Sequence, residues 1–558
     1  MPATDCKIAF VTCGLTLMMG VDGAIAQTAN TVPDATRSQS LRELQQLQQS
    51  FDRYKIDNEA QTLREKSHTD ISPLQQQQEA RPGGDLTFTI RKLTHTHSSV
   101  LSPEEIQTVF ARWEGKTIQV DDIAKILDEM NALYRQKGYL VCQAAVKPQR
   151  ISEGHLEITL IEGQTDKVTV EGLKSTNESF VRGAFSIESG KVANYRKMLD
   201  DLVRFNMTND VALTIDISAG EVEYSSDYTI RATEPDRWGG SVFADTTGSD
   251  STGRPRIGAT IVNRSVLGRR DAFTLLGLAS QGSKSAMASY AVPLNSFGTR
   301  ISGTLSYGEV EIVDGPSKGF DVTGESLLMS VRLEHPFYVT QNQKWTAWVD
   351  AGRQKSTTDM FGDIRIADTV IKTYSVGVDA VAFGSNWLTV ATLDVTHHDA
   401  QEELFSNTYR YEIGHANFSG RYTFSSGIEL SGSLTSQWRL AGDDFVSADY
   451  FYLGHTSGVR GYDNDVVSAQ EGAILSFELT YPLFGPQASI FAFSDVGHLW
   501  GESPYSEKTL WSAGFGVNWP LFDGASMRAS AAFPLKRNLD DDIDVNHARF
   551  DLSFVGTW

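Results

Sequence analysis

The last nine residues, F-D-L-S-F-V-G-T-W (550–558), carry the pattern that decides the fold class. Apolar residues and a glycine occupy every second position to the end of the chain: Phe550, Leu552, Phe554, Gly556 and Trp558. Because successive side chains of a strand point to opposite faces, this spacing predicts one wholly apolar face. A lipid-facing barrel strand has such a face, with an aromatic residue at the membrane interface, whereas the alternative is the last strand of a soluble sandwich.

The preceding 300 residues repeat this alternation and favour the barrel. Residues 236–558 contain about 16 segments of roughly ten residues with period-2 alternation, separated by polar or glycine-rich turns, an even number as in bacterial barrels. Examples are Ser326–Glu334, Trp345–Ala351, Ile428–Trp438 and Leu475–Tyr481. We therefore predict an all-β, 16-stranded antiparallel transmembrane barrel over 236–558.

Four prolines recur near the ends of these segments: Pro293, Pro336, Pro482 and Pro520. Proline cannot donate a hydrogen bond to a strand neighbour, so each is predicted to mark a strand terminus. By strand counting all four fall on one side of the membrane, beside short connections, which predicts periplasmic turns.

Residues 86–235 have a different pattern and are predicted to form two α+β units in tandem. In residues 86–163 a short strand is followed by a helix start at Ser102-Pro103-Glu104-Glu105, which has the sequence of a capping box. A second apolar helix face follows Asp121, and two strands then end at Gly163. Residues 164–235 repeat the order β-α-α-β-β, which indicates an internal structural repeat.

The N-terminal part reads as a signal followed by one helix. Lys7, the apolar run Ile8–Val21 and Ala24-Ile25-Ala26 predict a signal peptide over 1–26, cleaved before Gln27. Residues 27–85 are predicted to hold an amphipathic helix from Ser40 to Lys66 and then a polar linker from Ser67 to Asp85. The helix is indicated by apolar residues at helical spacing: Leu41, Leu44, Leu47, Phe51 and Tyr54.

Composition and motifs exclude several function classes. A formal net charge of −21 argues against nucleic-acid binding, and no apolar run reaches the ~18 residues of a membrane helix. Nucleotide-binding, serine-hydrolase and zinc-protease motifs are absent, so we predict no enzyme and no cofactor. Of three cysteines only Cys142 remains after cleavage, and His95-Thr96-His97 and His397-His398 lack further ligands. We therefore predict no metal and expect these histidines in solvated loops.

Two barrel segments stand out. The first, Val459-Arg460-Gly461-Tyr462, lies in the longest barrel connection, between the eleventh and twelfth strands. The second, Phe493-Ser494-Asp495-Val496-Gly497, lies inside the thirteenth strand, where alternation places Asp495 on the same face as Phe491 and Phe493. From the residues alone, two alternatives stay open: a salt bridge between Arg460 and Asp495 inside the barrel, or two solvated charges.

With these motifs the chain resembles the outer-membrane transporters of two-partner secretion (the TpsB family), within the wider superfamily of outer-membrane assembly barrels. V-R-G-Y on the sixth extracellular loop and F-x-D-x-G on the thirteenth strand look like the paired motifs of that family. Residues 86–163 resemble its POTRA domains, through Tyr134–Tyr139, Pro148-Gln149, Gly154–Ile158 and Glu162-Gly163. The first part of the barrel is also similar, at Asn263, Leu267-Gly268 and Asp271.

The resemblance covers the whole mature chain and implies an order of parts. These are a plug helix with its linker (27–85), POTRA 1 (86–163), POTRA 2 (164–235) and a 16-stranded barrel (236–558). It implies that Arg460 pairs with Asp495, with Val459, Gly461, Tyr462, Phe493 and Gly497 completing the two motifs. It also implies that the helix carrying Leu41, Leu44, Leu47 and Phe51 plugs the pore, and that Phe554 and Trp558 form the C-terminal strand signal.

The implied function is export without ATP across the outer membrane of a Gram-negative bacterium. The POTRA domains, in the periplasm, would capture an unfolded TpsA-like partner, such as a large adhesin, cytolysin or contact-dependent toxin. Further implied partners are outer-membrane lipid, the barrel assembly machinery and periplasmic chaperones, and no nucleic acid. An alternative is a barrel assembly or insertion factor, and a third is a simple porin or receptor barrel. The chain departs from the family at Leu453-Gly454-His455, where Gly-Gly is usual, and at Phe205-Asn206-Met207-Thr208, which lacks Leu-Pro.

Overall fold

The computed structural model describes residues 36, 38–66, 87–151, 153–483, 488–501, 503, 505–539 and 545–558. Contacts divide the chain into two compact units, each described here by itself. One holds residues 65–235 with 296–298, and the other holds the remainder. The predicted signal peptide (1–26) and linker (67–85) lie outside the described residues.

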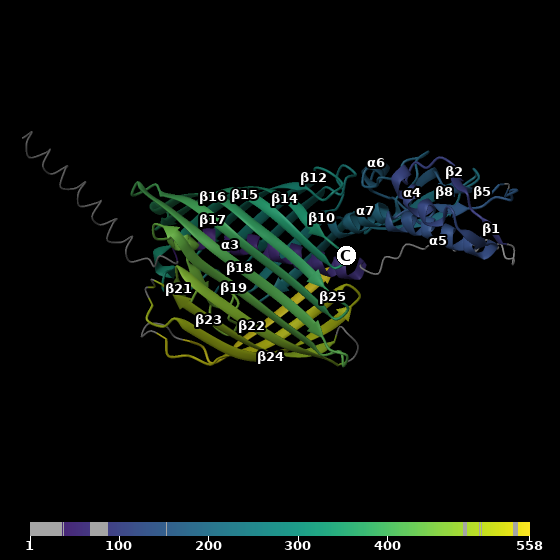
Figure 1. The fold of residues 1–558 in the computed structure, drawn as a ribbon. Helices are drawn as coiled ribbons and strands as arrows, with labels where there is room; N and C mark the ends of the chain where they lie inside the picture. Colours follow the sequence, from purple (N-terminus) through teal and green to yellow (C-terminus); the bar gives the residue numbers. More distant parts are fainter. Residues whose placement is uncertain are drawn as a thin grey trace, which may run out of the picture. The chain divides into compact units, whose positions relative to one another are not determined.

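The larger unit is a closed barrel of 16 antiparallel strands, which confirms the predicted fold (Figure 1). Its first eight strands are β9 (Trp238–Asp245), β10 (Arg256–Asn263), β11 (Ala272–Ala279), β12 (Ser283–Pro293), β13 (Arg300–Glu311), β14 (Thr323–Val339), β15 (Gln343–Met360) and β16 (Ile364–Phe383). The other eight are β17 (Trp387–Glu402), β18 (Asn407–Thr423), β19 (Glu429–Gly442), β22 (Glu471–Pro482), β23 (Ser489–Trp500), β24 (Thr509–Phe522), β25 (Ala525–Pro534) and β26 (Arg549–Thr557). The last strand pairs with the first, Phe554 opposite Ala244, so the sheet has no free edge.

The strands differ strongly in length around the barrel. Strands β9 to β11 have 8 residues each, whereas β15 has 18 and β16 has 20. We call the rim where β9 begins and β26 ends the near rim, and the opposite rim the far rim. A spanning strand needs about 9–11 residues, so the strands from β14 to β18 extend well past the apolar band.

The four prolines do not all end strands, and this prediction is wrong for two of them. Pro293 and Pro482 are the last residues of β12 and β22. Pro336 and Pro520 lie inside β14 and β24, and the strand register shifts directly after each, so each sits at an irregularity of the β-bulge type. A bulge leaves a residue out of the hydrogen-bonded ladder, which accommodates proline as well as a strand end does.

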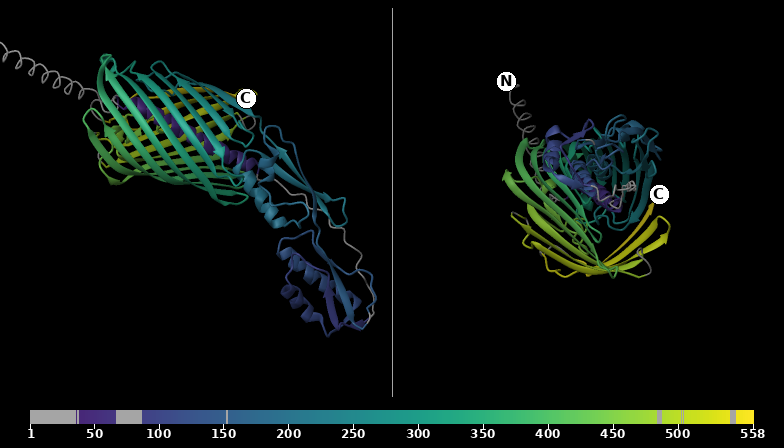
Figure 2. Two further views of the ribbon diagram at one scale, coloured as in Figure 1. Left: turned by 90° about the horizontal axis from the view of Figure 1, so that it is seen from above. Right: turned by 45° about the vertical axis from the view of Figure 1, so that its right-hand side comes forward.

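A helix lies inside the barrel. Helix α3 (Gln39–Lys66) runs along the lumen, as Figure 1 and the left view of Figure 2 show. Its 28 residues match the predicted helix of Ser40 to Lys66. No helix in the described part of the chain is both long and apolar enough to cross a bilayer.

The smaller unit contains the two predicted β-α-α-β-β repeats. The first repeat consists of β1 (Thr87–Thr89), β2 (Lys92–His95), α4 (Pro103–Trp113), β3 (Thr117–Gln119), α5 (Val120–Gln136), β4 (Gln143–Ala145) and β5 (His155–Ile161). The second consists of β6 (Thr165–Glu171), α6 (Glu178–Arg182), α7 (Tyr195–Thr208), β7 (Ala212–Ala219) and β8 (Ser226–Thr233). Ser102 and Glu105 form the predicted capping box at the start of α4.

Both repeats have the same sheet topology, because in each the last strand is central. The sheet orders are β2-β5-β4 and β6-β8-β7, with one parallel and one antiparallel neighbour in each. A separate apolar core lies under each sheet. Within the first repeat, Glu162 follows β5 and accepts hydrogen bonds from Ser98, Ser99 and the Tyr134 hydroxyl.

Candidate functional site inside the barrel

The connection between β19 and β22 folds against the inner wall of the barrel. It contains a 3-10 turn, η2 (Ser447–Asp449), and a small hairpin of β20 (Phe451–Leu453) and β21 (Val467–Ala469). We call residues 443–470 the inner loop. Its apolar side chains form one buried cluster with side chains of the wall: Phe451, Leu453, Val459, Tyr462, Val467 and Ala469 with Ile474, Leu499 and Leu510.

Arg460 and Asp495 form a forked ion pair in this contact. The guanidinium Nε and Nη2 of Arg460 each donate to a different carboxylate oxygen of Asp495, at 2.8 Å. The backbone N–H of Arg460 adds a third hydrogen bond at 3.1 Å. Asp495, on β23, is fully buried, and the guanidinium also lies 3.6 Å from the centre of the Phe493 ring. The structure therefore has the paired geometry rather than two solvated charges.

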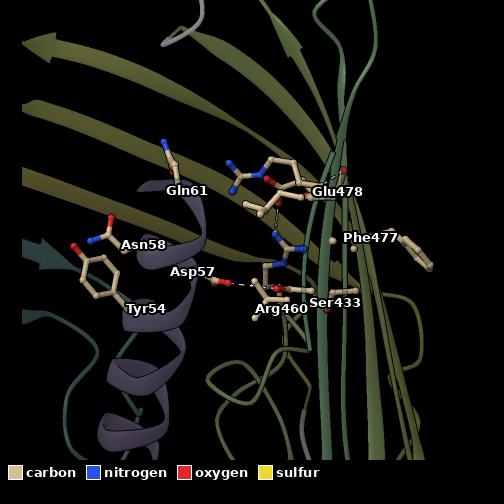
Figure 3. Close-up of a pocket in the computed structure, with 16 residues that line it drawn as sticks. Tyr54, Asp57, Asn58, Gln61, Ser433, Arg460, Phe477 and Glu478 are labelled. Carbon is tan, nitrogen blue, oxygen red and sulfur yellow. Dashed lines mark hydrogen bonds and ion pairs between the residues drawn. The ribbon is translucent and has the colours of Figure 1, made fainter. Parts of the chain in front are cut away.

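The ion pair continues into a larger network on the wall. Arg460 also donates to Glu478 of β22 at 2.7 Å, and Arg528 of β25 donates to both oxygens of the same carboxylate. Arg528 lies over Phe491, 3.7 Å from its centre, as Arg460 lies over Phe493. Figure 3 shows Arg460 reaching Glu478 beside a cavity of about 400 Å³ that helix α3 also lines. Each carboxylate thus has an arginine partner, as buried charges require.

The other motif residues explain how the loop can approach so closely. A Cβ on Gly497 would lie 2.7 Å from Leu453 and 2.9 Å from Val459, so only glycine leaves room for the loop. Gly461 has φ +96° and sits against Ala532. Tyr462 is fully buried, with its hydroxyl 2.7 Å from the Lys536 carbonyl oxygen. Both glycines therefore serve the contact between loop and wall.

The inner loop also contacts the last strand of the barrel. Arg549 of β26 is 2% exposed and donates to the carbonyl oxygens of Tyr462 and Gly248. It forms an ion pair with Asp551 and lies 3.6 Å from Asp463 of the loop. This side of the loop is thus fixed where the barrel closes.

Helix α3 contacts both the wall and the inner loop, mainly through polar groups. Arg42 is 4% exposed, pairs with Asp465 of the loop at 2.5 Å, and lies 4.2 Å from the centre of the Tyr452 ring. Glu43 accepts hydrogen bonds from Thr252 and Ser283. The helix is therefore attached near its first turns both to the inner loop and to the barrel.

The predicted apolar stripe of α3 is only partly packed. Leu41 and Leu44 are buried, Leu47 and Phe51 are half-buried, and Tyr54 is 62% exposed. Leu47, Phe51 and Tyr54 line a cavity of about 610 Å³ between the helix and the first strands of the barrel. The stripe thus faces open space over much of its length, because the lumen is wider than the helix.

Two other predictions concern the chain end and the histidines. Phe554 and Trp558 are both exposed, and the backbone N–H of Trp558 donates to the Gly240 carbonyl oxygen where the first and last strands meet.

His397 and His398 lie on strand β17, not in a loop, and His398 is buried, 2.9 Å from Asp449 and stacked on Tyr411. The expectation of solvated loop histidines is therefore wrong here, because the strand extends farther than its alternation indicated. Among the described residues, no three His, Cys, Asp or Glu side chains are grouped as metal ligands would be.

Sequence reasoning missed Glu478, Arg528 and the Arg42–Asp465 pair. Alternation along β22 gives a signal for Glu478, because Phe477 and Leu479 face outward and place it inside. Arg42 is a single cation near the start of a leucine- and glutamine-rich helix, which is a weak signal. Its partner follows only from the path of the inner loop.

Comparisons with known proteins agree with this architecture. Residues 225–519 match the family model described as haemolysin secretion/activation protein ShlB/FhaC/HecB. Residues 88–163 match the model of the ShlB-type POTRA domain.

Similar proteins include two transporters. The heme/hemopexin transporter protein HuxB of Haemophilus influenzae is 23% identical over 82% of this chain and 84% of its own length. The outer membrane transporter CdiB of Escherichia coli is 23% identical over 77% of this chain and 76% of its own. A solved structure of CdiB from Escherichia coli superposes with a TM-score of 0.68 at 20% identity, covering 93% of this chain and 98% of that one.

A solved structure of BamA from Haemophilus ducreyi, lacking POTRA domains 1–3, also shares the fold. Its TM-score is 0.53 at 13% identity, over 85% of this chain and all of that one. The family model covers more than half of the chain and includes strand β23 with Asp495. The chain therefore belongs to the haemolysin secretion/activation family ShlB/FhaC/HecB, the outer-membrane transporters of two-partner secretion.

Proposed function

We propose that this protein exports one large partner polypeptide from the periplasm to the cell surface through its barrel. The observation that carries the proposal is the combination of two β-α-α-β-β repeats, the first of the POTRA type, with a 16-stranded barrel whose lumen holds both a helix and an inner loop. Along the chain, strand β9 begins at the near rim directly after the second repeat. The near rim therefore faces the periplasm, and the far rim faces the outside. Proteins of this family are transporters, and no chemical step is needed for such a role.

The two repeats are proposed as the site that captures the client. Each sheet has two edge strands, and an extended polypeptide can add to such an edge through main-chain hydrogen bonds. This recognition requires free backbone groups, so an unfolded client is bound and a folded one is not. Folding of the client outside would then favour movement in one direction without ATP.

The inner loop and helix α3 are proposed to have different roles in the lumen. The pair of Arg460 and Asp495, with Val459, Gly461, Tyr462, Phe493 and Gly497, fixes the loop to the wall. Helix α3 acts as a plug through Leu41, Leu44, Leu47 and Phe51, and withdraws to let the client pass. Phe554 and Trp558 of the last strand are proposed as the signal read by the barrel assembly machinery, to which periplasmic chaperones would deliver the chain.

The client is proposed to be a large secreted adhesin, cytolysin or contact-dependent toxin. This follows from the relatives, among which are heme/hemopexin, CdiB and hemolysin transporters. A neighbouring open reading frame for a large secreted β-helical protein would identify it.

The test is capture by the periplasmic part of the protein. Residues 27–235 should retain a denatured N-terminal fragment of the client and not the same fragment when folded. Nascent barrel proteins retained in its place would support a barrel assembly factor, the alternative role. Equal retention of folded and unfolded client would argue against strand addition.

A further inference from the structure

Strands β15 and β16 carry three cations at one place on the outer face of the barrel. Arg353 and Lys372 are directly opposite each other in the strand register, and Lys355 lies two residues farther along β15. Register partners in an antiparallel sheet have Cβ atoms about 5 Å apart, and residues two apart on one strand share a face. We call Arg353, Lys355 and Lys372 the basic triad.

The triad faces away from the lumen. The alternate residues Gln354 and Ser356 contact helix α3, through Gln45 and Ser40, so their neighbours Arg353 and Lys355 point outward. Ile371 packs with Leu41 of the same helix, which places Lys372 outside as well. All three cations are exposed.

The triad begins where the apolar outer surface of these two strands ends. From the near rim, the outward residues of β15 are Trp345, Ala347, Val349 and Ala351, and the next is Arg353. On β16 the outward residues from the near rim are Ala382, Ala380, Val378, Val376 and Tyr374, and the next is Lys372. This apolar stretch is roughly 20 Å tall for tilted strands, close to the ~25 Å apolar band of outer-membrane barrels. The triad therefore lies at the headgroup level of the outer leaflet, bordered by the aromatic Tyr374.

The three cations have no acidic partner within the described residues. No hydrogen bond or ion pair joins any of them to another described side chain. Glu325, on the same outer face of β14, lies diagonal to Lys355 in the register, and two further carboxylates pair with other arginines. Asp399, opposite Lys372 on β17, pairs with Arg410 at 3.8 Å, and Asp359 pairs with Arg365. In a protein of net charge −21, three neighbouring cations that form no ion pair with a described residue leave a local positive site.

We propose that the basic triad binds the phosphate groups of an anionic glycolipid of the outer leaflet, of the lipid A type. Phosphate groups on such a lipid lie at the depth of the triad, while its acyl chains cover the apolar outer residues below. Arginine can bind phosphate through two parallel hydrogen bonds, and two lysines add point charges. The site would hold the tall wall of β14 to β18 at a defined height in the membrane.

The test measures lipid binding to the full-length protein in detergent by native mass spectrometry. The probes are bisphosphorylated lipid A and the same lipid without phosphates. The variant is Arg353→Gln/Lys355→Gln/Lys372→Gln. The control is Lys284→Gln, an exposed outward cation on β12 that faces Glu309 in the register. Each cation at an anionic surface contributes about 1 kcal/mol, less in salt, so three predict a roughly tenfold to hundredfold weaker binding of lipid A.

We expect the triple variant to lose this affinity, and the control and a charge-keeping variant, Arg353→Lys/Lys355→Arg/Lys372→Arg, to retain most of it. Lipid without phosphates should bind weakly to all of them. Equal binding of lipid A by the triple variant and the unchanged protein would overturn the proposal. So would displacement of the lipid by millimolar inorganic phosphate, which would indicate a site for free phosphate.

A folding control keeps the result interpretable. Heat-modifiable mobility on gels reports a folded barrel, and if the triple variant fails it, the three single Gln variants are measured instead. Each should weaken lipid A binding severalfold, and three single variants that all bind like the unchanged protein would also overturn the proposal.

Discussion

Helix α3 and the inner loop share the same lumen, but the structure holds them in different ways. The loop is covalently continuous with the wall at both ends, packs a buried apolar cluster, and places an arginine on the fully buried Asp495. The helix has three buried leucines, exchangeable contacts such as Ser40 to Ser326 and Gln45 to Gln354, and one buried arginine. Such neutral hydrogen bonds each contribute only about 1 kcal/mol net, because water can replace them. This difference supports the proposal that the loop stays in place while the helix leaves the lumen.

The largest effect is expected from breaking the loop contact. Arg460→Ala leaves the buried Asp495 carboxylate without its cation, which can cost about 3–5 kcal/mol when burial is deep. We expect Arg460→Ala and Asp495→Ala each to reduce secretion of the client tenfold or more while a barrel remains in the membrane. The measurement is client in the medium, with heat-modifiable mobility of the transporter as the check on folding.

The double variant sharpens this test. Arg460→Ala/Asp495→Ala should be little worse than either single variant, since both changes remove the same interaction. Arg460→Lys should not restore full secretion, because an ammonium does not reproduce the fork of donors. Strictly additive defects, or normal secretion in the single variants, would show that the pair has no such role.

Removing the helix is the next largest change. Deletion of residues 38–66 should raise ion conductance in planar bilayers severalfold, because α3 occupies the lumen beside cavities of about 400 and 610 Å³. Export should be largely intact. Gln49→Ala, on an exposed position of the same helix, serves as the control and should conduct like the unchanged protein. Conductance that does not rise on deletion would count against a plug.

A single substitution should loosen the helix partially. Arg42→Ala removes the ion pair with Asp465 and the contact with Tyr452, and we expect a shift of about 2 kcal/mol towards the undocked helix. The channel should then open more often than in the unchanged protein, but less often than after deletion of the helix. Arg53→Ala is the matched control, since Arg53 is exposed and donates hydrogen bonds to the neutral side chains of Asn417 and Thr435. An equal response to both substitutions would rule out a special role for Arg42.

The smallest expected effect lies outside the barrel, in the first repeat. Burial alone would raise the pKa of Glu162, but hydrogen bonds from Ser98, Ser99 and Tyr134 outweigh it and hold that pKa below its usual value. A depressed carboxyl pKa gives stability that is present above the unfolded value of about 4.3 and is lost as pH falls through the folded pKa. Urea unfolding of residues 65–235 should show this loss below about pH 4. Glu162→Gln should lower stability near pH 7 by roughly 1–2 kcal/mol and flatten the dependence; an unchanged pH profile would contradict this.

The sequence predicted the parts of this structure that depend on local periodicity. Alternation alone placed Asp495 on the same face as Phe491 and Phe493, and it indicated about 16 strands. Helical spacing located α3 to within a residue or two. These features follow from which face of an element is apolar, and that is visible in the order of residues.

The errors and omissions concern features that local periodicity does not contain. A proline predicts a strand end, but Pro336 and Pro520 show that a bulge satisfies the same constraint inside a strand. His398 lies past the apolar part of β17, where a strand outside the membrane no longer needs to alternate in the same way. Glu478 and Arg528 join Arg460 from strands 18 and 68 residues away, so their meeting depends on closure of the barrel.

The unequal strand lengths make the far rim of the barrel slanted. Strands of 16–20 residues from β14 to β18 rise above the membrane, while β9 to β11 end near its surface. At about 3.3 Å per residue and a tilt near 40°, the additional residues correspond to a screen of roughly 20 Å on one side. A polypeptide emerging from the lumen would therefore reach open water first on the side of β9 to β11 and find a partly sheltered surface on the other. Its first folded turns would form in a half-open vestibule, with the direction of release set by the lengths of the strands.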